Sequence, residues 1–362
     1  MTTDKYVALD VDSANIVIGV YDVKGQQIMR GCIRTNGNDI RQFFKGLNGT
    51  VHVVFEEGTQ AAWLYDLIRP LVAGVTVCDP RENKLLKSGN KSDDIDVDKL
   101  ARLLRLGDLQ AVYHGEETIQ GLKHLVGAYE NLVSDTIRAM NRLKAMFRGR
   151  GIGSRGTKVF SNEGRDDWLT KLTIEGLRAR AGYLYKQIDC LMKLRMEARK
   201  AMCSEAIKHS AYKLIKSVPG IGPIRTAQII ATAGTPHRFR TKRQWWPYCG
   251  LAVVTRTSAD YEWVGENVRK RKRAPQTRGL NKNYNRRLKQ VFKGAALNAI
   301  RTNEQFKEYY QRLIDKGIRP EMAQLTVARK LSAITLAVWK KGEKFDPEKL
   351  NQADTKHRQP VN

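Results

Sequence analysis

The order of apolar runs in the first 106 residues constrains the fold of this chain more than any other feature. Short runs rich in Val, Ile and Tyr, bounded by turn residues, predict strands at 6–11, 16–23, 26–34, 51–55 and 74–78. Helical spacing of apolar residues predicts helices over 59–71 and 92–106. The first part of the chain is therefore predicted to be an α/β domain, in which three meandering strands precede alternating helix and strand.

This order is that of a ribonuclease-H-like domain, and its chemistry would be carried by acidic residues. Asp10 lies inside an apolar strand, where a carboxylate is costly unless it is paired or bound to a metal. Glu56 ends the fourth strand, and Asp93 and Asp96 are spaced to share one face of the last helix. Two-metal phosphoryl transfer needs several hard oxygen ligands converging from different elements. These four acids are the predicted metal site.

Neighbouring acids leave alternatives open. Asp12 lies on the same strand face as Asp10 and is its rival, and Glu57 is the rival of Glu56. Asp94 and Asp98 are explained without chemistry, because acidic residues near a helix N-terminus are stabilised by the helix dipole.

The distribution of charge divides the chain. The 362 residues contain 64 Lys and Arg against 37 Asp and Glu, a formal charge of +27. Residues 1–110 carry a net charge of −1, which leaves +28 on the remaining 252. A basic surface of this size is typical of a protein that neutralises phosphates. We therefore expect a nucleic-acid partner, the alternatives being a ribosome-like packing protein or charge that serves solubility.

Other classes are excluded by composition. No apolar run approaches the roughly 18 residues of a membrane span, so no membrane association is expected. The first residues show no apolar signal stretch, which predicts a cytoplasmic protein. The five cysteines are scattered and never in Cys-x-x-Cys spacing, which argues against a disulfide framework and a structural zinc site.

The middle of the chain predicts a helical arm. Apolar residues recur in steps of three and four over 117–148, as in a long amphipathic helix or a coiled-coil strand. A break rich in Gly and Arg follows at 148–156, and a second helix is predicted from about 166 to 207. An αα-hairpin that pairs protomers is the simplest interpretation, and an ordinary pair of core helices is the alternative.

The second half contains a motif that resembles a helix–hairpin–helix. In Pro-Gly-Ile-Gly, Gly220 and Gly222 would allow a tight turn, and the backbone N–H groups of the following helix would hold a phosphate. A plain turn between packed helices is the alternative. Further helices are expected over 303–315 and 321–341.

A basic stretch lies between that motif and the last helices. It interleaves cationic residues with Trp245, Trp246, Tyr261, Trp263 and Tyr284, as suits gripping phosphates and stacking on bases. The cationic residues predicted to bind nucleic acid are Arg256, Arg269, Lys270, Arg271, Lys272, Arg273, Arg278, Lys282, Arg286 and Arg287.

Taken in order, these residues resemble the DEDD insertion-sequence transposases, which are bridge-RNA-guided recombinases. Asp10 in Val-Ala-Leu-Asp, Glu56 in Phe-Glu-Glu-Gly, and the pair Asp93 and Asp96 resemble the acidic tetrad of that family. The Pro-Gly-Ile-Gly hairpin, the segment 248–251 and the arginine-rich helix resemble its carboxy-terminal transposase domain. The resemblance extends over nearly the whole chain, with the helical arm between the two parts.

The resemblance implies a mechanism and partners. The amino-terminal domain would be RuvC-like and bind Mg²⁺, or Mn²⁺ as an alternative, through the tetrad. Ser258 would be the nucleophile that forms a covalent phosphoserine intermediate, with Tyr248, Tyr261 and Tyr284 as rivals in principle. A structured guide RNA, donor and target DNA, and further copies of the chain in a dimer or tetramer are the implied partners. The setting implied is a prokaryotic, nucleoid-associated one.

The expected domains are an acidic catalytic domain, a coiled-coil arm, a mainly helical transposase domain and a tail, at 1–112, 113–208, 209–345 and 346–362. Two other functions remain open at this point. A junction-resolving nuclease would use the tetrad with water as the nucleophile. An RNA- or DNA-binding scaffold would use neither the tetrad nor Ser258.

Overall fold

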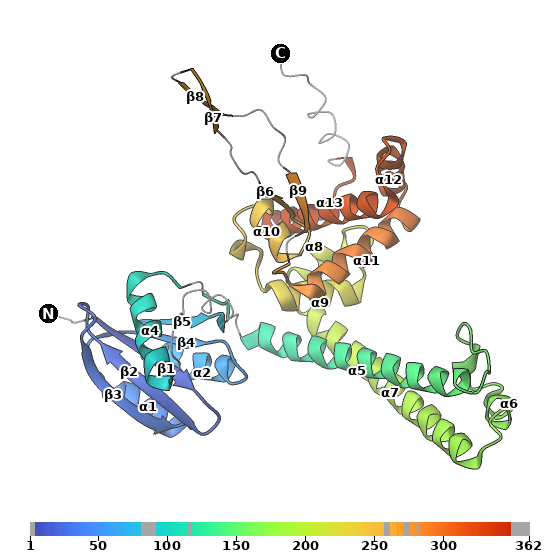
Figure 1. Cartoon of the computed structure of the whole chain (residues 1–362), viewed down its shortest axis with the longest axis horizontal. Helices are drawn as coiled ribbons and strands as arrows, with labels where there is room; N and C mark the ends of the chain where they lie inside the picture. Colours follow the sequence, from blue (N-terminus) through green and yellow to red (C-terminus); the bar gives the residue numbers. More distant parts are fainter. Residues whose placement is uncertain are drawn as a thin grey trace. The chain divides into compact units, whose positions relative to one another are not determined.

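A computed structural model describes the chain in two compact units, residues 1–115 and 116–362 (Figure 1). The described residues are 4–80, 92–109, 111–114, 117–256, 261–265, 267–270, 276–280 and 282–348. Among them, no helix is both long enough and apolar enough to span a membrane. The expected boundary between the arm and the transposase domain, between residues 208 and 209 of the second unit, stays a prediction.

The first unit is built on a five-stranded mixed sheet with the order β3-β2-β1-β4-β5. The first three strands pair antiparallel, and β4 is parallel to both β1 and β5. The strands are β1 (Asp4–Val11), β2 (Asn15–Tyr21), β3 (Gln27–Arg34), β4 (Thr50–Glu56) and β5 (Gly74–Cys78). All five predicted strands are confirmed, and the arrangement is consistent with a DEDD nuclease-like domain.

Helices cover both faces of this sheet. One face packs against α1 (Gly37–Lys45) and α2 (Ala61–Ile68), which continues as the 3₁₀ turn η1 (Arg69–Leu71). The other face packs against α4 (Asp93–Leu106), which confirms the helix predicted after the last strand. Helix α1 was not predicted, although Asn36 caps it by accepting hydrogen bonds from two backbone N–H groups.

Two small residues let α4 lie close to the sheet. Ala8 of β1 and Gly19 of β2 are partners in the strand register, beneath the helix. A Cβ atom on Gly19 would lie 2.5 Å from Cγ1 of Val97, closer than two carbon atoms can approach. The absence of that side chain therefore sets the distance between α4 and the sheet.

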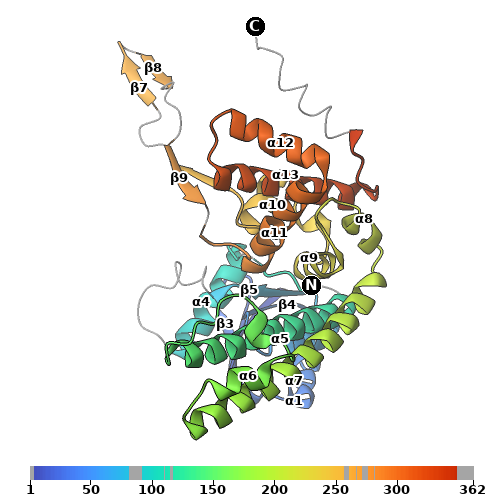
Figure 2. The same cartoon turned by 90° about the vertical axis from the view of Figure 1, so that its right-hand side faces the viewer.

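In the second unit, α5 (Glu117–Arg148) and α7 (Glu175–Ile207) lie side by side as a long hairpin (Figures 1 and 2). The first helix has the predicted bounds. The prediction of one continuous second helix from 166 was wrong, because α6 (Arg165–Thr170) ends four residues before α7 begins. In the break, the buried Leu172 presents its carbonyl to the guanidinium of Arg178, with N–O distances of 3.1 and 3.2 Å.

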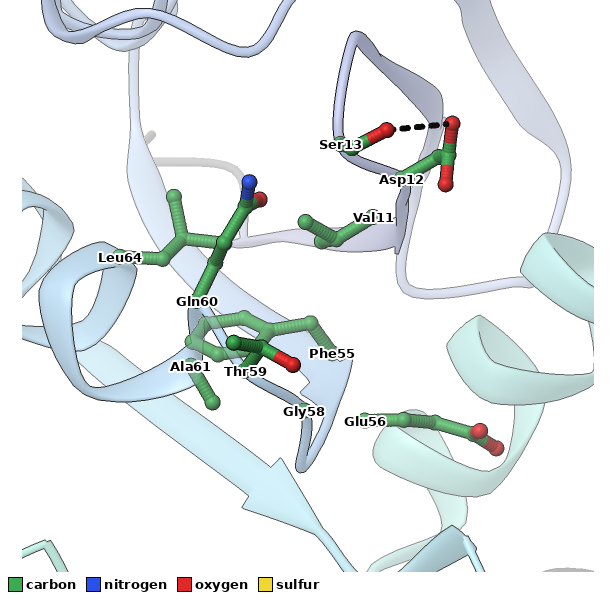
Figure 3. Close-up of a pocket in the computed structure, with 10 residues that line it drawn as sticks. All are labelled: Val11, Asp12, Ser13, Phe55, Glu56, Gly58, Thr59, Gln60, Ala61 and Leu64. Carbon is green, nitrogen blue, oxygen red and sulfur yellow. Dashed lines mark hydrogen bonds between the residues drawn. The ribbon is translucent and has the colours of Figure 1, made fainter. Parts of the chain in front are cut away.

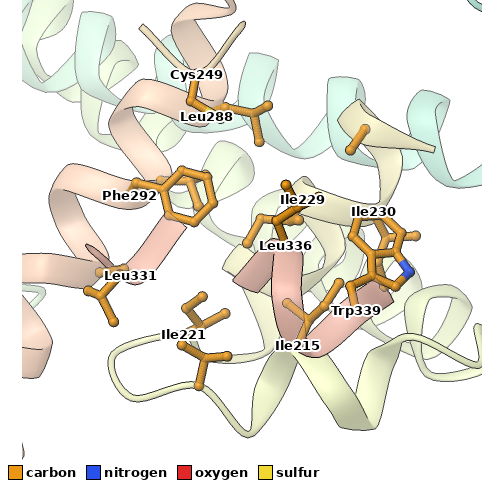
Figure 4. Close-up of a cluster of buried hydrophobic side chains, with 14 of the residues drawn as sticks. Ile215, Ile221, Ile229, Ile230, Cys249, Leu288, Phe292, Leu331, Leu336 and Trp339 are labelled. Atoms are coloured by element: carbon orange, nitrogen blue, oxygen red, sulfur yellow. The ribbon is translucent and has the colours of Figure 1, made fainter. Parts of the chain in front are cut away.

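The helices that follow α7 share one hydrophobic core with the first turns of α5 and the last turns of α7 (Figure 4). Leu122 and Val126 of α5 and Met202 of α7 belong to this core. Its other helices are α8 (Tyr212–Lys216), α9 (Pro223–Ala233), α10 (Lys242–Tyr248), α11 (Arg286–Thr302), α12 (Glu304–Asp315) and α13 (Pro320–Lys341), with the 3₁₀ turn η3 (Pro236–Arg238). The two last helices confirm their predicted positions.

Four short strands in the second unit were not predicted. Strand β6 (Val253–Arg256) pairs antiparallel with β9 (Gln276–Leu280), and β7 (Tyr261–Val264) pairs antiparallel with β8 (Asn267–Lys270). The β-branched and aromatic residues that favour strands were present. Their runs of only four or five residues, interrupted by charged side chains, give a weak strand signal.

Candidate acidic site and nucleic-acid interface

Asp10 and Glu56 lie next to each other at the carboxyl ends of two parallel strands. Leu9 of β1 pairs with Phe55 of β4, so Asp10 and Glu56 are the next residues on neighbouring strands. Side chains alternate along a strand, and Ala8 and Val54 belong to the core under α4. Asp10 and Glu56 therefore face the side of the sheet that α4 covers, and both are half-buried.

Helix α4 brings two further acids to the same side. Ser92 caps the helix by accepting a hydrogen bond from the backbone N–H of Ile95 at 3.3 Å. Val97 and Leu100 are buried against the sheet. Asp93 and Asp96 each precede one of them by four residues, so they continue the buried face by one turn. Asp93 is exposed, whereas Oδ1 of Asp96 is buried.

The four carboxylates suit a divalent cation by their chemistry, since they supply hard oxygen ligands from β1, β4 and α4. Within the part of the chain that the structure describes, no three His, Cys, Asp or Glu side chains form a group that could hold a metal ion. The four acids share one side of the sheet, but their side chains are not grouped around a common point. They would have to turn toward one another to bind the same ion.

Asp94 and Asp98 belong to a separate network on α4. Arg30 of β3 forms an ion pair with Asp94 at 2.7 Å and a second one with Asp98, which also accepts a hydrogen bond from the hydroxyl of Tyr21. Burial, followed by the contact with Asp98, raises the pKa of Tyr21 to about 12. Asp94 and Asp98 therefore have a structural role, as predicted. They fulfil it through contacts with Arg30 and Tyr21 as well as through the helix dipole.

Glu57 and Asp12, the alternatives to Glu56 and Asp10, have different surroundings from them. Oε2 of Glu57 lies 2.8 Å from Nε2 of His114, whose buried ring stacks on Tyr65 at a centroid distance of 4.9 Å. Asp12 is exposed beyond the end of β1. The sequence analysis did not consider His114. It is the last described residue of the first unit, in a stretch without regular spacing, and its sequence context gave no signal.

A pocket of about 340 Å³ opens beside Glu56 (Figure 3). Phe55, Ala61 and Leu64 give it an apolar part, and Figure 3 shows the carboxylate of Glu56 directed away from Leu64. Its polar lining includes Gln60, whose buried Oε1 has no hydrogen-bond partner among the described residues. The acidic site therefore borders a partly apolar recess formed by the ends of β1 and β4 and the start of α2.

The two glycines of the predicted phosphate hairpin have different surroundings. Gly220 has φ +79° and packs on α11 so closely that a Cβ atom would lie 2.2 Å from the carbonyl oxygen of Ala295. Its own carbonyl accepts a hydrogen bond from Arg225 at 2.8 Å, and burial lowers the pKa of that guanidinium. Gly222 is the N-cap of α9, with open space at its Cα. Gly220 is therefore explained by its packing on α11, whereas open space surrounds the Cβ position of Gly222, and phosphate binding by this hairpin stays a prediction.

We predict that Gly220→Ala destabilises the second unit by about 3 kcal/mol, because a side chain there is strained in φ and collides with backbone. Gly222→Ala is the matched control, and it should cost about 1 kcal/mol or less. The measurement is the shift of the urea midpoint of the transition that reports on this unit. Equal shifts for the two variants would contradict the packing role of Gly220.

The predicted cationic contacts divide into three groups. Arg287 has a partner within the protein, because its guanidinium is held by Glu130 of α5, with Nη2 2.7 Å and Nε 2.8 Å from Oε2, and its contact with nucleic acid stays a prediction. Arg269, Lys282 and Arg286 are exposed. The backbone of Arg256, Lys270 and Arg278 lies in strands β6, β8 and β9, whereas Ser258, Arg271, Lys272 and Arg273 lie outside the described residues.

The aromatic residues of the basic stretch differ in their burial. Trp245 is buried and donates its indole N–H to the carbonyl of Ser332 at 2.9 Å. Trp246 donates to the carbonyl of Arg329 at 3.2 Å. Tyr284 packs against Gly250, where a Cβ atom would lie 2.5 Å from its ring. Trp245 is therefore a core residue, which the sequence analysis did not anticipate, whereas Trp246 and Tyr284 are half-buried and their contact with bases stays a prediction.

Two family profiles match the chain. Residues 7–150 match a transposase profile of the DEDD, IS110 type, and residues 212–311 match the profile described as "Transposase IS116/IS110/IS902 family". A search of curated proteins found no match. Transposases bind DNA, and DEDD transposase domains typically depend on a divalent metal. The chain therefore carries IS110-family transposase domains, which support a role as an enzyme that cuts and rejoins DNA.

Proposed function

We propose that this protein is an RNA-guided DNA recombinase, in which Asp10, Glu56, Asp93 and Asp96 hold Mg²⁺ and Ser258 is the nucleophile. The observation that carries the proposal is that these four acids lie on the same side of the sheet. The mechanism further rests on the resemblance of the segment around Ser258 to the bridge-RNA-guided recombinases.

The residues of this chain would divide the reaction between them. The hydroxyl oxygen of Ser258 attacks the scissile phosphorus, a P–O bond to a deoxyribose oxygen breaks, and that oxygen leaves as a hydroxyl. The proton lost by Ser258 passes to a base or to solvent. A bound divalent ion supplies charge neutralisation at the scissile phosphate. The four carboxylates bind and orient, and the serine ester retains the energy of the phosphodiester for rejoining.

The guide and the oligomer are part of the same proposal. The charge of +28 on residues 111–362 is large enough for both an RNA and a DNA partner. We infer a structured guide RNA that pairs with donor and target DNA. The active assembly would be a dimer or tetramer, in which the acids of one protomer meet Ser258 of another. Purifying the protein with its bound nucleic acid and sequencing that nucleic acid tests the guide directly, and recovery of DNA alone would contradict it.

A junction-resolving nuclease is the second candidate. It is favoured by the fact that all four acids belong to the first unit, which lacks Ser258. In that case water replaces the serine, the products carry free ends, and Ser258 is dispensable.

We predict that Gly19→Ala lowers metal-dependent DNA cleavage by about tenfold to a hundredfold. The added Cβ lies 2.5 Å from Val97, so α4 must move and carry Asp93 and Asp96 away from the sheet. Gly31→Ala on β3 is the control, because nothing lies within 4 Å of its Cβ position. The cleavage rate of each variant at saturating Mg²⁺ is the measurement, and equal rates would show that the approach of α4 is unimportant.

A further inference from the structure

The hairpin formed by β7 and β8, labelled in Figure 1, carries exposed aromatic side chains. The exposed fractions are 63% for Tyr261 and 74% for Trp263, and Val268 is 55% exposed. Exposed apolar side chains that gather in one patch mark interaction sites, whereas single ones are ordinary, so the arrangement of these residues decides their meaning. Trp245 of the same basic stretch is buried, and Trp246 and Tyr284 are half-buried, so the exposure of Tyr261 and Trp263 requires its own explanation.

The strand register places these side chains together. Trp263 pairs with Val268 across the hairpin, so both project from the same face. Tyr261 is two residues from Trp263 and shares that face, whereas Val264 projects from the opposite one. Residues two apart on a strand are separated by about 6.7 Å. This separation is close to twice the 3.4 Å rise between stacked bases, so it matches the spacing of alternate bases in a stack.

Charge indicates which partner fits this face. Arg269 is exposed on β8, and the sequence continues with Lys270, Arg271, Lys272 and Arg273. Within residues 261–270 the cations Arg269 and Lys270 are balanced by Glu262 and Glu266, so the excess positive charge comes from the residues that follow. Two copies of this part of the chain would repel each other, because residues 111–362 carry a net charge of +28. A polyanion with exposed π-faces is complementary to both the charge and the rings.

We propose that the face formed by Tyr261, Trp263 and Val268 is a stacking platform for the unpaired bases of a nucleic-acid strand. It deepens the proposed function, because strand exchange exposes unpaired bases that a duplex conceals. The rings stack on the bases, and the cations of the hairpin contact the phosphates on either side. Stacking accepts any base, so the platform grips a strand without reading its sequence.

The test compares binding of three probes of one mixed sequence: a single-stranded DNA, the matching RNA strand and the DNA duplex. We expect Trp263→Ala to weaken binding to single strands about tenfold and to leave duplex binding within about twofold, whereas Trp263→Phe keeps most of the affinity. The difference between the DNA and RNA strands identifies which one the platform holds. Val264→Ala, on the opposite face of the same hairpin, should bind all three probes as the parent protein does.

Three results would overturn the platform. Unchanged single-strand affinity in both Trp263→Ala and Tyr261→Ala would show that the rings make no contact. An equal loss for single strands and duplex would assign the effect to charge alone. A change in oligomeric state with unchanged nucleic-acid affinity would show that another copy covers this face. Binding needs no catalysis, so failure of the serine mechanism leaves this test intact, and failure of the platform leaves that mechanism intact.

Discussion

Asp96→Asn is expected to lower metal-dependent DNA cleavage by at least about 100-fold while leaving DNA binding unchanged. The amide retains the shape of the side chain but removes the charge that a cation requires. Asp96 has one buried carboxylate oxygen and lies on the sheet side of α4, one turn from the buried Leu100. Cleavage rates across a Mg²⁺ titration, together with DNA affinity measured without metal, separate a loss of chemistry from a loss of binding.

Asp94→Asn is the matched control, because it makes the same change two positions away on the same helix. Asp94 pairs with Arg30 at 2.7 Å and is 63% exposed, so removing its charge should affect neither the acidic site nor stability by more than about 1 kcal/mol. Activity within about twofold of the parent is expected for Asp94→Asn. Full activity in Asp96→Asn would remove that residue from the metal site, and absence of any cleavage by the parent protein would favour a scaffold.

The first unit could be predicted from sequence because its strands are short, β-rich and separated by clear turns. Such a local pattern survives folding, and the alternation of buried residues fixes the register of β1 and β4 around Asp10 and Glu56. The sequence left Glu57 open beside Glu56, and the partner that the structure gives Glu57, His114, is 57 residues away. Long-range partners of this kind have no local signal.

The second unit was predicted less well, for a related reason. A positive side chain has the same sequence signal whether it meets a phosphate or an ion-pair partner. Arg287 was therefore placed among the nucleic-acid contacts, although Glu130, 157 residues away, holds it. The aromatic residues pose the same problem, because Trp245 and Trp263 are similar in sequence context but one is buried and the other is 74% exposed. Only the packing of α10 and α13 distinguishes them.

Ser258→Ala is expected to abolish both the covalent DNA–protein adduct and recombination, because no oxygen remains to form the phosphate ester. The parent protein should give an adduct that survives denaturation, and acid hydrolysis of that adduct should yield phosphoserine. Phenylalanine replacements of Tyr248, Tyr261 and Tyr284 are the controls, since each removes a rival hydroxyl and keeps the ring. All three should still form the adduct.

The products decide between the two candidate functions even where an adduct is short-lived. If Ser258 is the nucleophile, Ser258→Ala gives neither adduct nor exchanged strands, while DNA binding persists. If water is the nucleophile, Ser258→Ala cleaves as fast as the parent protein and leaves free 5′-phosphate ends. Asp96→Asn is inactive under both mechanisms, so the pair of variants separates the attacking group from the metal site. Phosphotyrosine in the hydrolysate, with activity retained in Ser258→Ala, would instead assign the attack to one of the three tyrosines.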